Sequence, residues 1–190
     1  MTRDRATARA VVEELFRLHH AEIYAYLARM LRDDELAADL TQDTFVKAYR
    51  AYESLEDASR ARAWLYQIAS RTALDELRRR RIVRFIPWTG ESRGADRSAE
   101  DTAMQGRFSA EMERALDAIP ERQRNALILA EIHELTGLEL ASALGVSHVA
   151  ARALLSRGRE SLRQALAVER ARGGTHGAAE RPSEHGEDES

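Results

Sequence analysis

The chain has 190 residues, of which 44% are hydrophobic and 32% charged, and its formal net charge is −3, so it is long enough for one ordinary domain or two small ones. It has no cysteine, which excludes disulfides and thiolate metal sites, and no stretch reaches the roughly 20 apolar residues that span a bilayer. Few Gly and Pro residues, and no run of alternating β-branched residues, predict an all-α fold.

Three stretches in the first half of the chain carry apolar residues at helical spacing: 8–31, 33–55 and 63–82. Asp33 and Asp34 offer a start for the second helical stretch, because a carboxylate can accept a hydrogen bond from a first-turn N–H. Residues 56–62 are polar and predict a loop. We expect a first helical domain over residues 8–84.

The periodicity breaks at residues 85–107, which contain Pro87 and several Gly, Ser and Thr residues, as is typical of a flexible linker. It resumes over 108–167, which we expect to form a second helical domain. Residues 168–190 offer few apolar side chains to bury and are rich in acids, so they predict a disordered acidic tail. The N-terminus has no apolar core of signal-peptide length, and we expect a cytoplasmic protein.

The second domain contains a pattern typical of a helix-turn-helix. The small Ala141 lets a following helix approach closely, and Gly145 can adopt a positive φ in the turn. Ser147 can accept an N–H hydrogen bond from a second helix that begins near His148. In DNA-binding proteins this second helix enters the major groove, whereas the alternative is an ordinary helical hairpin with a glycine turn.

Basic residues on the second helix favour DNA, since phosphates need cations near the docking helix. They are Arg152, Arg157, Arg159 and Arg163. The same helix has few side chains that could read base edges, because Ala150, Ala153 and Leu154 occupy much of it.

A second candidate surface lies on the helix expected over 63–80. At about 100° per residue, five side chains fall on one flank: Trp64, Gln67, Arg71, Asp75 and Arg78. Such a stripe can stack on a base, donate to base edges and hold phosphates. The alternative is a solvated, salt-bridged face with a half-buried tryptophan.

The run of arginines at 78–81 does not form one patch, because it winds most of the way around the helix. Arg78 continues the stripe, and Arg79 lies at its edge, where it can pair with Asp75. Arg80 faces Glu76, and Arg81 is left to the helix end and solvent.

The order and spacing of these segments over about 8–166 resemble a bacterial sigma factor of the extracytoplasmic-function type (group IV of the sigma-70 family). Residues 38–52 (ADLTQDTFVKAYRAY) resemble the core-polymerase-binding helix of sigma region 2, and 62–81 (RAWLYQIASRTALDELRRRR) its −10-reading helix. Residues 119–129 (IPERQRNALIL) and the helix-turn-helix resemble sigma region 4.

The resemblance implies three sets of site residues. The set facing the polymerase β′ clamp helices comprises Asp39, Gln42, Asp43, Phe45 and Val46. The −10 set combines a specificity loop with the reading helix and comprises Ser54, Asp57, Ser59, Arg60, Trp64, Gln67, Arg71, Asp75, Arg78 and Arg79. The −35 set comprises Ser147, His148, Arg152, Arg157 and Arg159.

The sequence departs from the family pattern at a few positions. Thr72 stands where family members commonly carry Asn, and Gly158 stands where they usually carry Ala. On the recognition helix, apolar side chains occupy positions that are often polar or basic in the family.

The implied function is that of a sigma factor, which directs core polymerase to promoters and stabilises strand opening at −10. The implied partners are the polymerase core (β′ clamp helices and β flap), promoter DNA and an anti-sigma factor, with no membrane, cofactor or metal. A stand-alone dimeric helix-turn-helix regulator is the main alternative. An enzyme is disfavoured, because His19 and His20 lack the i,i+4 spacing of a metal pair and no nucleophile–base arrangement is readable.

Overall fold

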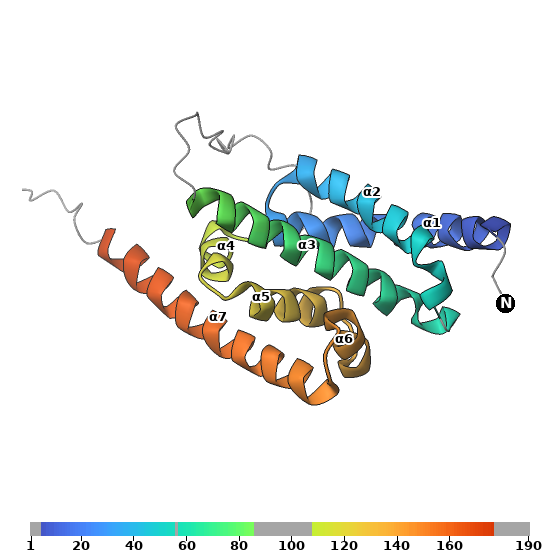
Figure 1. Cartoon of the computed structure of the whole chain (residues 1–190). Helices are drawn as coiled ribbons and strands as arrows, with labels where there is room; N and C mark the ends of the chain where they lie inside the picture. Colours follow the sequence, from blue (N-terminus) through green and yellow to red (C-terminus); the bar gives the residue numbers. More distant parts are fainter. Residues whose placement is uncertain (1–4, 56, 86–107, 177–190) are drawn as a thin grey trace, which may run out of the picture. The chain divides into compact units, whose positions relative to one another are not determined.

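The computed structural model of the protein describes residues 5–55, 57–85 and 108–176, and these residues form helices joined by short turns (Figure 1). They contain no strand, which confirms the predicted all-α fold. The elements in chain order are α1 (Arg5–Leu31), α2 (Asp34–Arg50), the 3-10 helices η1 (Tyr52–Ser54) and η2 (Ala58–Arg60), α3 (Ala61–Phe85), α4 (Ala110–Asp117), α5 (Glu121–Leu127), the π-helix η3 (Ile128–Ile132), α6 (Gly137–Leu144) and α7 (His148–His176).

The chain divides into two compact units whose boundary falls within α7. The larger unit holds α1, α2, α3, α5, η3 and α6, together with α7 as far as Arg159. The smaller unit holds α4 and α7 from Glu160 onward.

The larger unit is built on α1, α2 and α3, which lie side by side (Figure 1). Their apolar stripes meet in a core that includes the fully buried Ile23, Tyr26 and Leu27 of α1 and the equally buried Leu65 and Tyr66 of α3. This burial, rather than helix propensity, supplies most of the free energy that holds such helices together.

The start of α2 follows the sequence prediction. Asp33 is the N-cap, and its carboxylate accepts a 2.9 Å hydrogen bond from the Leu36 backbone N–H. The Arg80 guanidinium also donates to this carboxylate over 2.8 Å. These two hydrogen bonds hold the pKa of Asp33 below its ordinary value, and the contact from Arg80 ties the end of α3 to the start of α2.

The same core continues into α5, η3 and α6. Ile128, Leu129 and Leu140 are buried in one cluster with the apolar residues of α1 and α3, and Ala151 of α7 is fully buried there too. The helix-turn-helix and the three-helix bundle therefore share one continuous core within the larger unit.

In the smaller unit, ion pairs join α4 to the C-terminal part of α7. The Arg114 guanidinium contacts the Glu169 carboxylate over 2.6 Å, and Arg170 reaches Glu111 over 3.3 Å. Ser109 caps α4 by accepting a hydrogen bond from the Met112 N–H.

The prediction of a disordered tail from residue 168 is wrong for residues 168–176, because α7 continues through His176. Ion pairs of Glu169 and Arg170 with α4 support this part of the helix, which continues although Gly173 and Gly174 are poor helix formers. Residues 177–190 of the predicted tail and 86–107 of the predicted linker lie outside the described residues. No single helix in the described ranges is long and apolar enough to cross a membrane.

Candidate nucleic-acid and polymerase interface

The helix-turn-helix forms as the sequence predicted. Gly145 ends α6 with a φ of 64°, a left-handed conformation that glycine adopts without a Cβ clash. The Ser147 hydroxyl then accepts a 3.2 Å hydrogen bond from the Ala150 N–H at the start of α7. At its other end, α6 begins with a reciprocal capping box between Thr136 and Glu139.

The −35 set lies on the exposed side of α7. Ser147, His148 and Arg152 are exposed around its first turns, as are Arg157 and Arg159 further along. Arg159 forms an ion pair with Glu131 over 2.6 Å, whereas Arg152 and Arg157 pair with no described carboxylate. The most available cations on this face are therefore Arg152 and Arg157.

The −10 helix differs from its predicted stripe at one end. Trp64 is only 8% exposed, and its indole Nε1 donates to the Ser54 hydroxyl over 3.2 Å. The expectation that this ring lies on the surface with Gln67 and Arg71 is therefore wrong. A periodicity argument could not separate the two cases, since a tryptophan at the edge of an apolar face suits either side.

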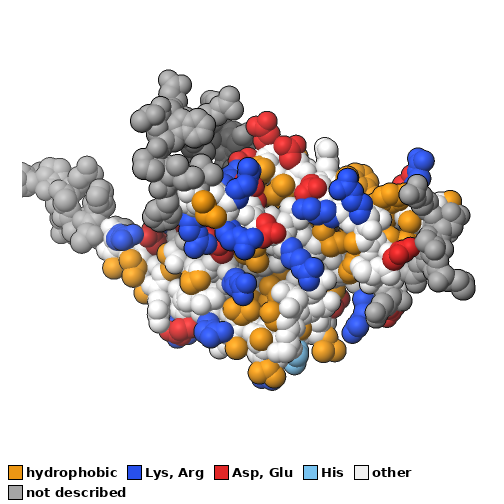
Figure 2. All heavy atoms as spheres, in the orientation of Figure 1, with side chains coloured by type: hydrophobic (Ala, Val, Ile, Leu, Met, Phe, Trp, Pro, Cys, Tyr) orange, Lys and Arg blue, Asp and Glu red, His pale blue; other side chains and the backbone are white. Residues whose placement is uncertain are grey.

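The remaining stripe residues do reach the surface of α3. Arg71, Asp75 and Arg78 are exposed, and Gln67 is half-buried. Figure 2 shows Lys and Arg side chains along the course of α3, with acidic side chains among them. The exposed face is thus mixed in charge.

The arginine run pairs differently from the prediction in two places. Arg79 contacts Glu76 over 2.8 Å rather than Asp75, which pairs instead with Arg78 over 2.8 Å. Arg81 is not left to solvent alone, because it forms a 2.8 Å ion pair with a carboxylate of α5, Glu121. The predicted pair between Arg80 and Glu76 is present at 3.1 Å.

Glu76 is the anchor of this run. Its side chain is only 10% exposed and accepts hydrogen bonds from Arg79 and Arg80, which hold its pKa below the ordinary value despite burial. Consequently, Arg79 and Arg80 are both ion-paired with a carboxylate of their own helix.

The predicted specificity loop is polar and ordered by its own side chains. Asp57 accepts from the Ser59 N–H over 2.9 Å and from the Ser59 hydroxyl over 2.7 Å, and these contacts lower the pKa of its carboxyl. The Ser54 hydroxyl donates to the Ala51 carbonyl over 2.6 Å while it accepts from Trp64. With Arg60, these residues are exposed, so the loop presents a preformed polar rim.

Three residues of the polymerase-facing set of α2 are exposed, Asp43 is half-buried and Phe45 is buried. Asp39, Gln42 and Val46 are exposed, and Asp43 forms a 2.7 Å ion pair with Lys47. Phe45, however, is only 6% exposed, so little of its ring is available for a direct contact, and its assignment to this set stays a prediction.

Phe45 instead packs edge-on against Phe16 of α1, with ring centroids 5.0 Å apart. Phe16 is 44% exposed and was not among the predicted residues. The sequence signal for Phe16 is that a large aromatic residue stands next to the expected core positions of the first helix without belonging to its apolar face. Phe16, beside Phe45, and Val46 therefore offer exposed apolar surface on α1 and α2.

Thr72, a departure from the family pattern, is buried on α3. Its hydroxyl accepts a 3.0 Å hydrogen bond from the Lys47 ammonium. The same ammonium contacts Asp43, so Thr72 helps to fix one carboxylate of the polymerase-facing set.

Gly158, the other departure, has a packing reason. A Cβ at this position would lie 2.9 Å from the Gln123 carbonyl oxygen and 3.0 Å from Leu127 Cγ. Real Cβ atoms essentially never come that close to a backbone oxygen. Glycine therefore permits the close approach of α7 to α5.

The helix-turn-helix turn lies against the −10 helix. A Cβ added to Gly145 would stand 3.4 Å from Gln67 Nε2 and 3.6 Å from an Arg71 Nη atom. Gln67 is accordingly half-buried, and part of the predicted −10 face is covered by the turn in this arrangement.

A buried polar cluster at His133 joins α1 and α3 to the end of η3. The Tyr66 hydroxyl donates to Glu22 over 3.2 Å and contacts His133 Nδ1 over 2.8 Å. Because an ionised carboxylate only accepts, the consistent arrangement has His133 Nδ1–H donating to Tyr66. The Arg62 guanidinium completes the cluster, donating to Glu22 and, over 2.7 Å, to the His133 carbonyl.

The cluster shifts the pKa of its members. Burial, with the nearby charge of Arg29, lowers the pKa of His133 to about 4. Burial alone would raise the pKa of Glu22, but hydrogen bonds from Arg62 and His19 hold it below its ordinary value. At neutral pH the imidazole is uncharged and the carboxylate ionised. No group of His, Asp and Glu in the described residues is arranged to hold a metal ion.

Two family models match this chain in separate places. The one described as Sigma-70 region 2 matches residues 15–82, and the one described as Sigma-70, region 4 matches residues 109–162. The first takes in the three-helix bundle with its α2 and α3 faces, and the second takes in the helix-turn-helix.

Two curated proteins illustrate the sequence similarity. RNA polymerase sigma factor CarQ of Myxococcus xanthus is 32% identical over 166 residues, which cover 87% of this chain and 95% of CarQ. ECF RNA polymerase sigma factor SigE of Mycolicibacterium smegmatis is 32% identical over 158 residues, and these cover 82% of this chain but only 61% of SigE.

A solved structure shares the fold. The sigma factor RpoE of Bartonella quintana, determined in complex with the anti-sigma factor NepR, aligns with a TM-score of 0.64 at 24% identity. The alignment covers 82% of this chain and 96% of that one.

Proposed function

Because the chain belongs to the extracytoplasmic-function group of sigma-70-family RNA polymerase sigma factors, we propose that three exposed faces divide the work of promoter recognition. The α2 face binds core polymerase, the α3 face with its loop captures the −10 element, and the start of α7 docks on the −35 element. The observation that carries this assignment is that one chain presents a mixed apolar and acidic face on α2 and separate arginine-bearing faces on α3 and α7.

For the α2 face, support comes from the combination of exposed groups. Asp39 and Gln42 offer acceptors beside Val46, which is 45% exposed, and Phe16 extends the apolar part. A protein interface of this kind buries an apolar centre inside a polar rim. Phe45 acts from behind, by packing against Phe16.

For the −10 element, Arg71 and Arg78 supply cations for phosphates, and the rim of Ser54, Asp57, Ser59 and Arg60 supplies donors and acceptors for an unstacked base. Trp64 holds the rim in place through Ser54 and is not itself a stacking platform. Unstacking a base costs a few kcal/mol per step, which contacts to the captured strand offset.

For the −35 element, Ser147, His148 and Arg152 lie at the start of the recognition helix, where base-edge contacts occur in proteins of this class. Arg157 and Arg159 lie further along and suit the phosphate backbone. Because few of these side chains read bases, we expect DNA shape to contribute to −35 recognition.

The rival reading as a stand-alone dimeric regulator is not favoured, since the similarity to sigma factors spans both the bundle and the helix-turn-helix. The proposed role needs no catalytic step, and we infer that the protein acts as a non-enzymatic initiation factor in the cytoplasm, where polymerase works. We also propose an anti-sigma factor as a partner, by analogy with the RpoE–NepR complex.

Transcription with purified core polymerase tests the proposal. Core plus this protein should start run-off transcripts at a specific subset of sites on a genomic fragment library. Failure to bind core in size-exclusion chromatography would overturn it.

Paired variants then test the division of labour. The double variant Gln42→Ala and Val46→Ser should weaken core binding at least about tenfold, the loss expected when interface anchors are truncated. Arg71→Gln with Arg78→Gln should leave core binding intact and reduce transcription. If both double variants lowered core binding equally, the separate assignment of the α2 and α3 faces would be wrong.

A further inference from the structure

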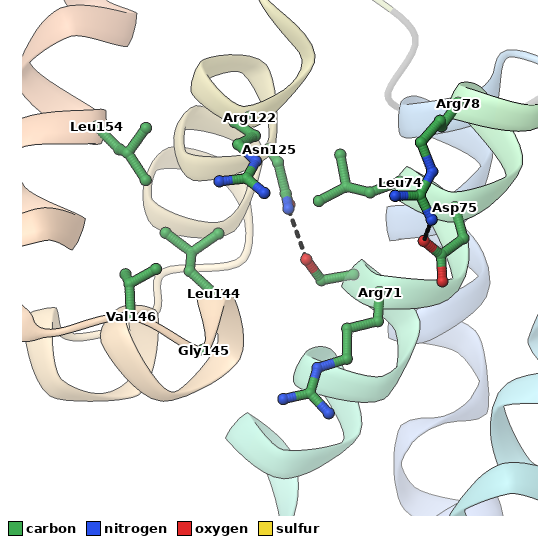
Figure 3. Close-up of a pocket in the computed structure, with 11 residues that line it drawn as sticks. Arg71, Leu74, Asp75, Arg78, Arg122, Asn125, Leu144, Gly145, Val146 and Leu154 are labelled. Atoms are coloured by element: carbon green, nitrogen blue, oxygen red, sulfur yellow. Dashed lines mark hydrogen bonds and ion pairs between the residues drawn. The ribbon is translucent and has the colours of Figure 1, made fainter. Parts of the chain in front are cut away.

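A hollow opens on the surface of the larger unit, between α3, α5 and the helix-turn-helix (Figure 3). Its volume is about 510 Å³, which is within the range of small-molecule sites in proteins. The polymerase and DNA surfaces described above account for only part of its wall.

The hollow is lined by three arginines and one carboxylate, Asp75, so its wall carries more positive than negative charge. Arg71 of α3 and Arg122 of α5 both line it, and neither makes an ion pair or side-chain hydrogen bond with any residue that the structure describes. By contrast, Arg79, Arg80 and Arg81 of the same α3 are each bound to a carboxylate. A third lining arginine, Arg78, is already opposed by Asp75. Two guanidinium groups thus remain for a ligand.

The rest of the wall is mixed, with the polar Ser70 and Asn125 beside several apolar side chains. Leu74 comes from α3, Leu144 from the end of α6 and Leu154 from α7, and Figure 3 shows them around the same space as the two arginines. All three leucines are only half-buried, so each still exposes apolar surface. A bare inorganic anion would satisfy the charges and leave these leucines in water. A neutral apolar molecule would leave the charges unmatched.

We propose that the hollow binds a small amphiphilic anion, with its charged head at Arg71 and its apolar body against Leu74, Leu144 and Leu154, while Arg122 adds a second positive charge to the wall. Guanidinium groups bind carboxylates and phosphates through paired N–H donors, so either head group suits the site. The occupant is a soluble molecule with an apolar body of medium length, because the volume of about 510 Å³ limits its size.

Binding has a conformational consequence. One wall belongs to α3 and the facing wall to the helix-turn-helix, so the site exists only while the two are packed together. A ligand that binds only this arrangement stabilises it. A bound anion would also compete with the −10 strand for Arg71. That competition, unlike the binding itself, rests on the proposed function.

Calorimetric titration of the full chain with sodium decanoate, kept below its micelle-forming concentration, tests the site. We expect saturable binding of one equivalent, weakened at least about tenfold in the double variant Arg71→Gln and Arg122→Gln, as for the loss of one charge-assisted contact and of a second cation in the wall. Arg50→Gln is the matched control, because Arg50 is an exposed arginine of the same unit that lies outside the hollow. Circular dichroism confirms that each variant is folded.

Further arms separate the contributions. Decyl phosphate should bind if the head group is interchangeable, hexanoate should bind several-fold more weakly than decanoate, and decyltrimethylammonium should not compete. Equal binding of inorganic phosphate would show diffuse charge only, and equal binding of the ammonium surfactant would show non-specific apolar contact. Either result, or unchanged decanoate affinity in the double variant, overturns the proposal.

A last measurement distinguishes failure of the ligand site from failure of the proposed −10 role of Arg71. Decanoate should lower the affinity of the protein for a −10 single strand in the wild type. If decanoate binds as expected but strand affinity is unaffected, the ligand site stands and the assignment of Arg71 to the −10 strand falls.

Discussion

The Tyr26 hydroxyl donates a 2.8 Å hydrogen bond to Oδ1 of Asn125, a residue 99 positions later in the chain. The other end of the same amide donates to the Ser70 hydroxyl over 2.6 Å, and all three side chains are buried. One asparagine of α5 therefore links α1 to α3, with both ends of its amide satisfied. Burial raises the pKa of Tyr26, so the phenol stays protonated as a donor.

Replacing Tyr26 by Phe should lower the free energy of unfolding by about 1–3 kcal/mol, because Oδ1 of Asn125 is left buried without a donor. Urea denaturation followed by circular dichroism measures the change. Tyr49→Phe is the matched control, since Tyr49 is 41% exposed and its loss should change stability by less than about 0.5 kcal/mol. Equal effects of the two variants would show that the Tyr26 hydrogen bond adds nothing.

Stability should fall as the pH drops from about 6.5 towards 4, in part because of His133. In the folded protein the pKa of His133 is about 4, whereas in the unfolded chain it is near 6.5. Between these values the unfolded chain binds a proton that the folded protein does not, so acid favours unfolding. The full contribution is on the order of 3 kcal/mol.

The difference in pH dependence between wild type and His133→Gln isolates this group from the surrounding Glu22, Arg29 and Arg62. The variant should be less stable than the wild type at pH 7 and should lose less stability on going to pH 4.5. Parallel stability curves over this range would show that folding leaves the pKa of His133 unchanged, contrary to its burial.

Gly158→Ala should destabilise the protein by about 1–3 kcal/mol, although alanine is the better helix former by about 1 kcal/mol. The added methyl group would press on the Gln123 carbonyl oxygen and force α7 away from α5. Ser156→Ala, at an exposed position of the same helix, controls for propensity and should be neutral or slightly stabilising. A stabilised Gly158→Ala protein would mean that α7 does not approach α5 this closely in solution.

Arg78→Ala should reduce promoter opening about tenfold, as expected when one phosphate contact worth about 1.4 kcal/mol is lost, and more than Arg81→Ala does. Arg78 lies with Asp75 on the exposed face of α3 that we propose for the −10 strand, whereas Arg81 is paired with Glu121. Permanganate reactivity of unpaired thymines in complexes with core polymerase measures opening. Equal losses in the two variants would indicate that the run acts only through diffuse charge.

The sequence carried enough information for the helices and their caps. Asp33, Gly145 and Ser147 were identified from local chemistry alone, because a cap or a left-handed turn depends on one residue and its immediate neighbours. The all-α class followed from apolar periodicity in the same way.

The side of a helix on which a borderline residue lies could not be predicted. Trp64 and Phe45 sit at the edges of apolar faces, and only tertiary contacts with Ser54 and Phe16 show that both are buried. The pairing of Arg81 with Glu121 was out of reach for the same reason, since it joins residues 40 positions apart. The −10, −35 and polymerase-contact residues remain predictions to be tested by the variants above.

The π-helix η3 sets the rotational phase of everything that follows it. In this turn the His133 N–H bonds to the Ile128 carbonyl, five residues back, so the turn holds one residue more than an α-helical turn would. Deleting one residue from η3 would restore ordinary helix and rotate the following residues by about 100°. His133 would move away from Tyr66, and the helix-turn-helix would be rotated about the axis of α5 and η3. A one-residue insertion or deletion in η3 would therefore change the orientation of the helix-turn-helix relative to α5.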